Sequence, residues 1–165
     1  MNAPALQLRS DAGEQVGVLA GIARKPQRRA PMEVIQCGEI TPAAGLVGDC
    51  RGVFKPGGRN RRQVTLFERR DWVAACAEIG VDAPWWLRRC NLLVDGLDLP
   101  QRPGALLRVG AAWLEVTVEC DPCSRMDAVA PGLFAALMPD WRAGACARVV
   151  SGGAIAVGDT IEVVG

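Results

Sequence analysis

Alternating apolar and polar residues predict that most of this chain forms short β-strands. The clearest alternation lies in residues 111–119, where Leu114, Val116 and Val118 alternate with two glutamates and a threonine. A period of two is typical of a strand with one face buried and the other in solvent. The same criterion predicts further strands at residues 15–24, 32–40, 63–65, 85–95, 105–109, 145–150, 154–157 and 160–164.

The spacing also predicts how two of these strands are arranged. In the first strand, the side chains of Val16, Val18, Ala20 and Ile22 fall on one face. Gly110 separates two apolar runs that each have the strand period. A glycine between two such runs indicates a hairpin, so we expect these two strands to pair with each other.

One segment has the period of a helix instead. Residues 68–79 carry an apolar stripe that includes Val73 and Cys76, which predicts an amphipathic helix. Thr65 and the glutamate three residues later have the spacing of a capping box. Gly80 is a natural helix stop. Cys76 is therefore expected to pack in the core and to take no part in chemistry.

Pro131 suits the first turn of a second, short helix over residues 131–138. Many short strands, glycine turns and two short helices predict a mainly β protein, a β-barrel with helical decoration. The sequence contains no internal repeat and no second domain. We expect a loose leader at residues 1–14 and one barrel domain over residues 15–165.

Composition narrows the chemistry. The 165 residues are 50% hydrophobic, which favours a folded chain. The net charge is +1, so no strong overall electric field attracts the protein to nucleic acid or to an anionic membrane. The chain has no histidine and no tyrosine. This excludes Ser-His-Asp and Cys-His catalysis and zinc sites with histidine ligands. Catalysis would use cysteine, carboxylates, arginine or a bound cofactor.

Seven cysteines are scattered along the chain except for one close pair. The first residues lack the basic start and apolar run of a signal peptide, and no apolar run is long enough to span a membrane. Free thiols in a reducing compartment are the simplest interpretation, so we expect a cytoplasmic protein.

The close pair of thiols lies on a turn after the clearest strand. Asp121-Pro122 removes a backbone donor where the chain must leave the sheet, and it separates Cys120 from Cys123. Arg125 follows two residues later, and a nearby cation favours the thiolate form of a cysteine. Cys123 is thus a candidate nucleophile or metal ligand.

Four interpretations of this pair are open. A structural zinc site would need further isolated cysteines from distant segments. A thioredoxin-type dithiol would need a helix starting at the first cysteine, whereas Pro131 predicts a later helix start. Both thiols could simply pack in the core. The fourth interpretation is a single soft ligand or sulfur carrier at Cys123.

Two other features bear on a site. Residues 51–62 carry five cations and no acid, but their one aromatic residue, Phe54, does not make the repeated interleaving of aromatic and basic residues that stacks on bases. We therefore expect a solvated or anion-facing loop there and no nucleic-acid partner. Asn91 lies among apolar residues of a predicted strand, where it either satisfies a local hydrogen bond or serves a site.

An ordered series of motifs resembles the MOSC domain, the family named after the C-terminal portion of molybdenum cofactor sulfurase. The match runs from about Val16 to the end of the chain, so the chain resembles a stand-alone bacterial-type MOSC protein. The motifs that carry the resemblance are residues 48–49, 63–66, 88–99, 104–110, 114–116, 120–126, 132–133, 148–149, 152–155 and 158–159.

The resemblance implies a β-barrel whose family cysteine handles sulfur or ligates molybdenum, and that role falls to Cys123. Thiolate is a soft ligand that suits a molybdenum centre. The pterin tail of the molybdenum cofactor carries phosphate, which arginine holds bidentately. Cys120 is left a supporting or packing role. The residues expected to bind the cofactor are Asp49, Arg88, Arg89, Asn91, Ser124 and Arg125.

This sequence departs from its relatives in two respects. Cys50-Arg51 stands after the Gly-Asp motif, where many relatives have arginine and often histidine, so roles borrowed from that position are in doubt. Cys50 is then an extra thiol near the site. The full sulfurase also has a pyridoxal-phosphate desulfurase domain, for which this chain has no room. Neither Lys25 nor Lys55 has a Schiff-base context, so no pyridoxal phosphate is expected.

The resemblance leaves three hypotheses open. The first is a molybdenum-dependent oxidoreductase that supports reduction of N-hydroxylated compounds with electrons from a separate protein partner. The second is a sulfurtransferase-like carrier that takes a persulfide on Cys123 from a cysteine desulfurase and delivers it to a cofactor or cluster. The third is a partner-binding barrel whose cysteines only pack, which predicts inaccessible thiols at both Cys120 and Cys123.

Overall fold

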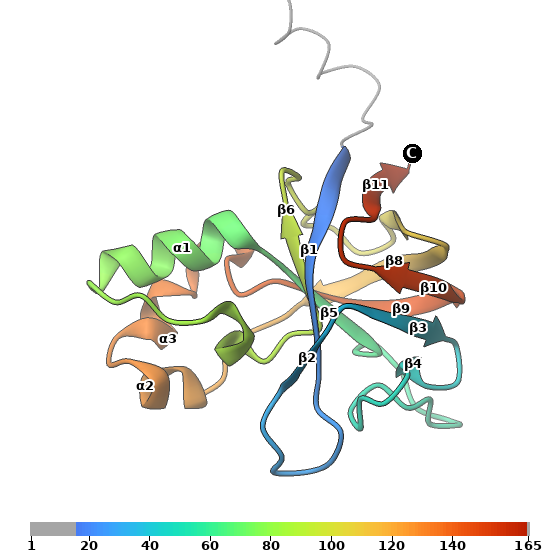
Figure 1. Ribbon diagram of the computed structural model, residues 1–165, viewed down its shortest axis with the longest axis horizontal. Helices are drawn as coiled ribbons and strands as arrows, with labels where there is room; N and C mark the ends of the chain where they lie inside the picture. Colours follow the sequence, from blue (N-terminus) through green and yellow to red (C-terminus); the bar gives the residue numbers. More distant parts are fainter. Residues whose placement is uncertain (1–15, 165) are drawn as a thin grey trace, which may run out of the picture.

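A closed ring of seven hydrogen-bonded strands forms the centre of the protein in the computed structural model, which describes residues 16–164 (Figure 1). The ring runs β1–β11–β7–β8–β9–β5–β6 and closes where β6 pairs with β1. The β5–β6 pair is parallel and the other neighbours in the ring are antiparallel. The strands are β1 (Val16–Arg24), β5 (Val64–Glu68), β6 (Leu92–Asp95), β7 (Leu106–Val109), β8 (Ala112–Glu119), β9 (Ala145–Ser151) and β11 (Thr160–Val164).

Smaller elements flank the barrel on two sides. Strand β2 (Glu33–Ile35) extends the sheet at β1, and β10 (Gly153–Ala156), β3 (Cys37–Thr41) and β4 (Gly45–Leu46) form a second sheet. The helices gather on the other side of the barrel (Figure 1). They are α1 (Arg69–Glu78), α2 (Arg125–Val129) and α3 (Leu133–Ala136), with 3₁₀ turns η2 (Trp85–Arg88) and η3 (Pro139–Trp141).

The mainly β-barrel fold predicted from the sequence is therefore confirmed. The hairpin at Gly110 is also confirmed, since β7 and β8 pair across it. No helix among residues 16–164 is long and apolar enough to cross a membrane. The predicted leader at residues 1–14 lies outside the described residues.

Two apolar clusters explain why the strands form where they do. One fills the barrel and includes Leu19, Leu66 and Leu114, while the other lies between the barrel wall and the helices and includes Phe67 and Leu93. Adjacent residues of β5 thus serve different clusters, and all five residues of β5 are buried. A strand covered on both faces loses its polar alternation, which is why the sequence showed only the start of β5.

The first strand presents the opposite face to the one expected at its start. Val16 and Val18 are 56% and 47% exposed, whereas Leu19 is fully buried in the barrel. The pairing of β1 with β6 shifts register between Leu19 and Gly21. Because such an irregularity changes which side chains face inward, a strict period of two does not hold along β1.

Residues 85–95 were expected to form one strand, and this prediction was wrong. The two tryptophans lie in the 3₁₀ turn η2, and the Trp85 ring lies 6.3 Å from that of Phe67, measured between centroids. Arg89 follows with a left-handed backbone (φ 73°), and the strand β6 begins only at Leu92. A short apolar run fits either structure by periodicity alone. Residues 89–91, between η2 and β6, are therefore not part of a strand and can place polar side chains at the end of the barrel.

Helix α1 forms as predicted but without the expected capping box. It begins after Glu68, whose side chain makes no cap hydrogen bond, and Thr65 lies inside β5. Cys76 is buried, as predicted, whereas Val73 is 57% exposed and lies outside the packed stripe. Gly80 ends the segment with a positive φ of 72°, as expected of a helix stop.

The second helical segment differs from the prediction in its start. Helix α3 lies inside the expected range, but α2 precedes it and begins at Arg125, directly after the thiol turn. The late helix start that argued against a thioredoxin-type dithiol is therefore wrong. The antiparallel pairing of β8 with β9 still differs from the parallel βαβ setting of such a dithiol.

Candidate functional site

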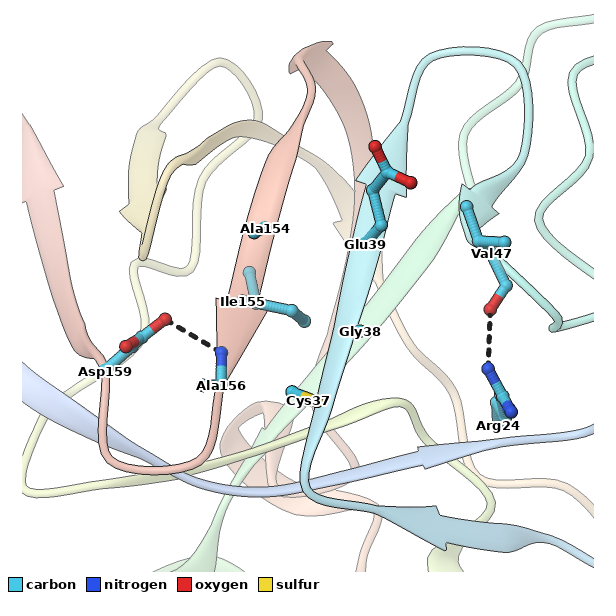
Figure 2. A pocket seen from close by; sticks show the side chains of 9 residues that line it. All are labelled: Arg24, Cys37, Gly38, Glu39, Val47, Ala154, Ile155, Ala156 and Asp159. Carbon is cyan, nitrogen blue, oxygen red and sulfur yellow. Dashed lines mark hydrogen bonds between the residues drawn. The ribbon is translucent and has the colours of Figure 1, made fainter.

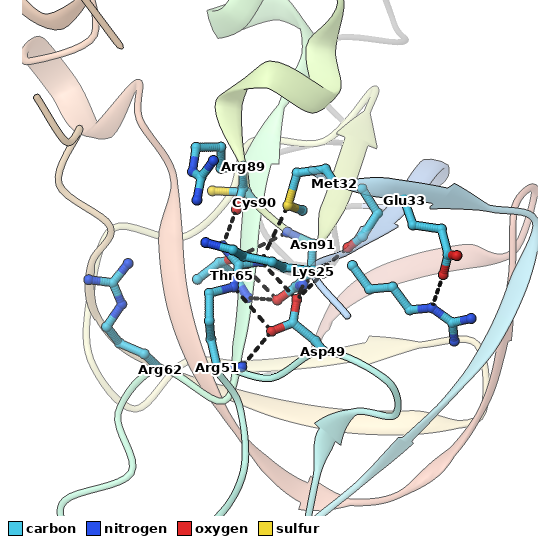
Figure 3. Close-up of polar contacts among 12 residues, drawn as sticks. Lys25, Met32, Glu33, Asp49, Arg51, Arg62, Thr65, Arg89, Cys90 and Asn91 are labelled. Carbon is cyan, nitrogen blue, oxygen red and sulfur yellow. Dashed lines mark hydrogen bonds and ion pairs between the residues drawn. The ribbon is translucent and has the colours of Figure 1, made fainter. Parts of the chain in front are cut away.

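A buried carboxylate organises one end of the barrel (Figure 3). Asp49 accepts hydrogen bonds from the backbone N–H groups of Lys25 (3.0 Å) and Arg51 (2.8 Å) and from the guanidinium of Arg51 (2.8 and 3.1 Å). Burial acts to raise the pKa of Asp49, but the hydrogen bond and charge of Arg51 outweigh it and hold the pKa below its ordinary value. Asp49 is thus an ionised anchor for Arg51.

Asn91 joins this anchor to the barrel. Its amide nitrogen donates to Asp49 (2.9 Å) and to the carbonyl of Ala23 (3.1 Å). Its amide oxygen accepts from the backbone N–H (3.1 Å) and the hydroxyl (3.2 Å) of Thr65. The residue is 3% exposed. Both ends of the amide are therefore used inside the protein, which favours the local hydrogen-bonding interpretation and a positioning role.

Four cations gather beside Asp49. Burial lowers the pKa of the Lys25 ammonium, and repulsion from the guanidinium groups of Arg89, Arg125 and Arg51 lowers it further. Lys25 is 7% exposed and forms no ion pair within residues 16–164. Arg51 also donates to the carbonyl of Arg89 at 2.7 Å. Of these four positive groups only Arg51 is paired with a carboxylate within residues 16–164, which leaves a charge excess that suits an anionic ligand.

A cavity of about 280 Å³ opens beside Asp49. Three guanidinium groups, those of Arg51, Arg62 and Arg89, line it together with the already paired Asp49. Arginine in this density is typical of sites that hold phosphate or carboxylate through paired hydrogen bonds. The lining residues are Asp49, Arg51, Gly52, Arg62, Gln63, Thr65, Arg89 and Asn91.

Cys123 lies on the exposed turn between β8 and α2. Its carbonyl accepts the backbone N–H of Met126 (3.0 Å), whose buried side chain fixes the turn to the core. Burial and neighbouring guanidinium groups lower the pKa of Arg89, and the negative charge of a Cys123 thiolate acts in the opposite direction. The thiol therefore lies within electrostatic reach of the group of cations that includes Arg89. Ser124, at the start of α2, and Arg125 are both exposed.

Arg88 is the one predicted cofactor-binding residue whose charged group is directed elsewhere. It is 3% exposed, and its guanidinium donates to the carbonyls of Ala143 (2.8 Å) and Cys120 (3.2 Å) and to the Cys120 sulfur (3.5 Å). A guanidinium engaged in this way is not available for a bidentate bond to phosphate. Arg88 therefore positions the turn that leads to Cys123.

The structure brings together residues that the sequence left apart. Lys25 and Arg62 were not among the expected site residues, and Arg51 was treated as a departure from the family pattern. The signal that could have found Arg51 and Arg62 is the acid-free basic run at residues 51–62, which was expected to face an anion. Cys50, expected near the site, is exposed and its backbone N–H donates to the carbonyl of Lys25 (2.8 Å).

Figure 2 shows a larger hollow, of about 580 Å³, over the small sheet. Its lining is mostly small or apolar, with one guanidinium, that of Arg24. Arg24 is already paired with Glu33 (2.6 Å) and with the carbonyl of Val47 (3.2 Å). The cavity beside Asp49 is therefore the better candidate for an anionic ligand.

Comparisons with known proteins agree with the resemblance seen in the sequence. No curated protein matches the chain. Among solved structures, the YuaD protein from Bacillus subtilis is similar with a TM-score of 0.73 and 21% sequence identity, over 91% of this chain and 96% of that one. YiiM from Geobacillus stearothermophilus is similar with a TM-score of 0.64 and 17% identity, over 92% of this chain and 75% of that one.

YiiM from Escherichia coli is also similar, with a TM-score of 0.62 and 18% identity, over 92% of this chain and 69% of that one. At these identities the solved structures show a shared fold. The family assignment rests on a separate match, because residues 54–162, which are more than half of the chain, fit the model of the MOSC domain. The chain therefore belongs to the MOSC domain family.

Proposed function

We propose that this protein binds the molybdenum cofactor in the cavity beside Asp49, with Cys123 as the molybdenum ligand. The observation that carries the proposal is an exposed thiol within electrostatic reach of Arg89, which lines a cavity together with two further guanidinium groups. A soft thiolate and a group of cations match the two ends of this ligand, a sulfur-rich metal and a phosphate-bearing tail.

Each side chain of the site has a defined task in this proposal. Arg51 and Arg89 hold the phosphate, and Lys25 adds charge beneath them. Asp49 fixes the Arg51 guanidinium in one orientation through two hydrogen bonds (3.1 and 2.8 Å). Preorganised charge of this kind binds an anion without the cost of ordering a free side chain. Ser124 and Arg125 border the thiol from the first turn of α2.

When bound, the molybdenum centre would supply two-electron redox chemistry for N-hydroxylated compounds, with electrons from a separate protein partner. The chain itself supplies the ligand, the phosphate clamp and the pocket. We further propose a cytoplasmic location, in keeping with seven cysteines that are all free thiols.

Metal analysis of freshly purified protein from cofactor-competent cells tests the proposal. We expect molybdenum in the wild type, its loss in Cys123→Ala and its retention in Cys76→Ala, whose thiol is buried under α1. Arg89→Ala should reduce the molybdenum content without removing the ligand. Equal molybdenum in the Cys123 and Cys76 variants, or none in the wild type, would refute the ligand assignment.

The exposure of Cys123 also favours a second candidate, a sulfur carrier. A persulfide on this thiol would be within reach of a partner desulfurase and would need no bound metal. Mass spectrometry after incubation with a cysteine desulfurase and cysteine separates the two candidates. An added sulfur on the Cys123 peptide supports the carrier, and an unchanged mass refutes it.

A further inference from the structure

Three buried thiols meet behind the wall of the cavity, and the proposed function uses none of them. Cys90, Cys120 and Cys146 come from the segment after η2, the end of β8 and the strand β9, and each is at most 2% exposed. The sulfur atoms of Cys90 and Cys120 are 3.9 Å apart. The buried Cys146 thiol lies close enough to Cys120 for each of the two to shift the pKa of the other, so the three thiols form one group.

Two guanidinium groups face this thiol group. Arg88 and Arg62 donate to the Cys120 sulfur at 3.5 and 3.7 Å. Neither arginine forms an ion pair with a carboxylate within residues 16–164. A buried guanidinium such as that of Arg88 is costly without a negative partner. The thiols are therefore the groups that can supply the missing negative charge.

The pKa values of the three thiols shift in different directions. The hydrogen bond to Cys120 and then burial raise the pKa of Cys90, which makes Cys90 the proton-donating end of the group. The hydrogen bond from Cys120 lowers the pKa of Cys146 more than burial raises it, and the charge of Arg62 lowers it further. The pKa of Cys120 is raised, chiefly by the interaction with Cys146 and by burial, while the charge of Arg88 acts to lower it. Cys120 is distinguished by geometry, since the Cys90 sulfur lies 3.9 Å from its sulfur and two guanidinium groups donate to it.

We propose that Cys90 and Cys120 are an oxidation site, a dithiol that a peroxide converts to an intramolecular disulfide. The Cys120 sulfur attacks one oxygen of hydrogen peroxide and the O–O bond breaks. The thiol proton passes to the departing oxygen, which leaves as one molecule of water, and Cys120 becomes a sulfenic acid. The Cys90 sulfur then attacks the Cys120 sulfur and the sulfenic oxygen departs as a second water. The two thiols lose two electrons and two protons in total, and the peroxide is reduced to two waters.

Arg62 controls access to this site. Its exposed side chain donates to the Cys120 sulfur and also lines the cavity, so this guanidinium lies between the cavity and the buried sulfur. The disulfide would tie the segment that carries Asn91 to the turn that carries Cys123. This inference concerns the chain's own thiols and holds whether or not Cys123 binds molybdenum.

Peptide mapping of the full-length protein after treatment with hydrogen peroxide and alkylation tests the proposal. We expect a linked peptide pair that contains Cys90 and Cys120, lighter by two hydrogen atoms than the sum of the two free peptides, and its disappearance after dithiothreitol. The midpoint of thermal unfolding should rise with the disulfide and fall again on reduction. Cys76 is the matched control, since it is equally buried but contacts no other sulfur within the described residues.

Variants distinguish formation of a disulfide between Cys90 and Cys120 from non-specific oxidation of the cysteines. Cys90→Ser should leave Cys120 as a sulfenic acid that dimedone traps, and Arg62→Ala should speed disulfide formation several-fold. Cys120→Ser should abolish the linked peptide while Cys76→Ser leaves it unchanged. Two results would overturn the assignment. One is free thiols at Cys90 and Cys120 under conditions that fully oxidise the exposed Cys37, and the other is a disulfide from Cys120 to Cys146.

Discussion

The side-chain amide of Asn91 donates to the carboxylate of Asp49 at 2.9 Å, and this contact joins the barrel interior to the cation group. Asn91 is anchored in turn to Thr65 on β5, and Asp49 anchors Arg51. The four residues form one continuous set of hydrogen bonds from a core strand to the cavity. Rigid barrel strands therefore set the orientation of the guanidinium groups.

Removal of the Asp49 charge should destabilise the protein strongly. Asp49→Asn leaves the Arg51 guanidinium without its buried counter-charge, which costs about 3 kcal/mol in the free energy of unfolding. Because the folded pKa of Asp49 lies below its ordinary value, this stabilisation is present above the unfolded pKa and is lost as the pH falls through the folded pKa. Urea unfolding at neutral pH measures the difference between the variant and the wild type.

The exposed carboxylate of Asp98 provides the control. Its ion pair with Arg70 is mostly solvated, with side chains 63% and 69% exposed, so Asp98→Asn should change the free energy of unfolding by less than about 0.5 kcal/mol. Similar losses in the two variants would show that Asp49 is an ordinary surface charge and not the anchor of the site.

Lys25→Met should move stability and anion binding in opposite directions. The buried ammonium has no ion-pair partner within the described part of the chain, so an apolar side chain should raise the free energy of unfolding by ~1 kcal/mol. Wild-type protein should be stabilised by inorganic pyrophosphate, by about 2.7 kcal/mol at 100 times the dissociation constant. The same variant should bind pyrophosphate more weakly, because one of the four cations is gone. Titration calorimetry and thermal unfolding measure the two effects.

Lys55 is the other lysine of the chain and is exposed on the basic loop. Lys55→Met should leave the unliganded stability nearly unchanged and retain most of the pyrophosphate response. An equal loss of pyrophosphate affinity in both lysine variants would mean that the anion binds to the whole basic face and not in the cavity beside Asp49.

Local patterns in the sequence predicted the elements that depend on neighbouring residues. The strand β8, the hairpin at Gly110 and the packing of Cys76 each follow from spacing within a few residues. The prediction failed at residues 85–95, where an apolar run is compatible with a turn or a strand and contacts of Trp85 with Phe67 decide. The strict alternation predicted for the first strand was also wrong, because the pairing of β1 with β6 contains a register shift.

The site was only partly predictable because it is assembled by closure of the barrel. Lys25, Arg51, Arg89 and Cys123 are distant in sequence. The pairing of β1 with β6, of β5 with β9 and of β8 with β9 brings strands next to their segments together. Cys123 and Arg89 were expected in the site from the family resemblance. Lys25 could not be expected, since its role depends on three guanidinium groups from other segments.

Gly144 marks a position where the backbone approaches too closely for any side chain. Its φ is +118°, and a Cβ atom there would collide with the carbonyl oxygen of Leu66 on β5. Its own carbonyl accepts the backbone N–H of Cys120 (2.9 Å). Gly144→Ala should therefore cost about 3 kcal/mol, from backbone strain and steric overlap together. Urea unfolding checks the value.

Gly96→Ala is the matched control, because Gly96 also has a positive φ (76°) but a Cβ atom there meets no other atom within 4 Å. Backbone strain alone should cost about 1 kcal/mol at this position. If the two alanine variants lose the same stability, the close approach of Gly144 to β5 has no energetic consequence.

Glu68 should make the protein less stable as the pH rises toward neutrality. Burial at the end of β5 is the main cause that raises its pKa from 4.5 to about 7, despite the hydrogen bond from the backbone N–H of Leu99 (3.0 Å). Between these two pH values the folded state holds a proton that the unfolded state has released, so the free energy of unfolding declines through this window. Above a pH of about 7 the decline ends, because both states are then ionised.

Glu68→Gln keeps an oxygen for Leu99 and removes the titration. We expect the variant to be more stable than the wild type above neutral pH by on the order of 2 kcal/mol, and to show a flatter pH dependence. Loss of the Glu68–Arg70 ion pair offsets little of this gain, since the Arg70 side chain is 69% exposed. Urea unfolding across the window measures both slopes, with Glu39→Gln on the exposed face of β3 as the control. Parallel curves for wild type and Glu68→Gln would show that the Glu68 carboxylate is not penalised by burial.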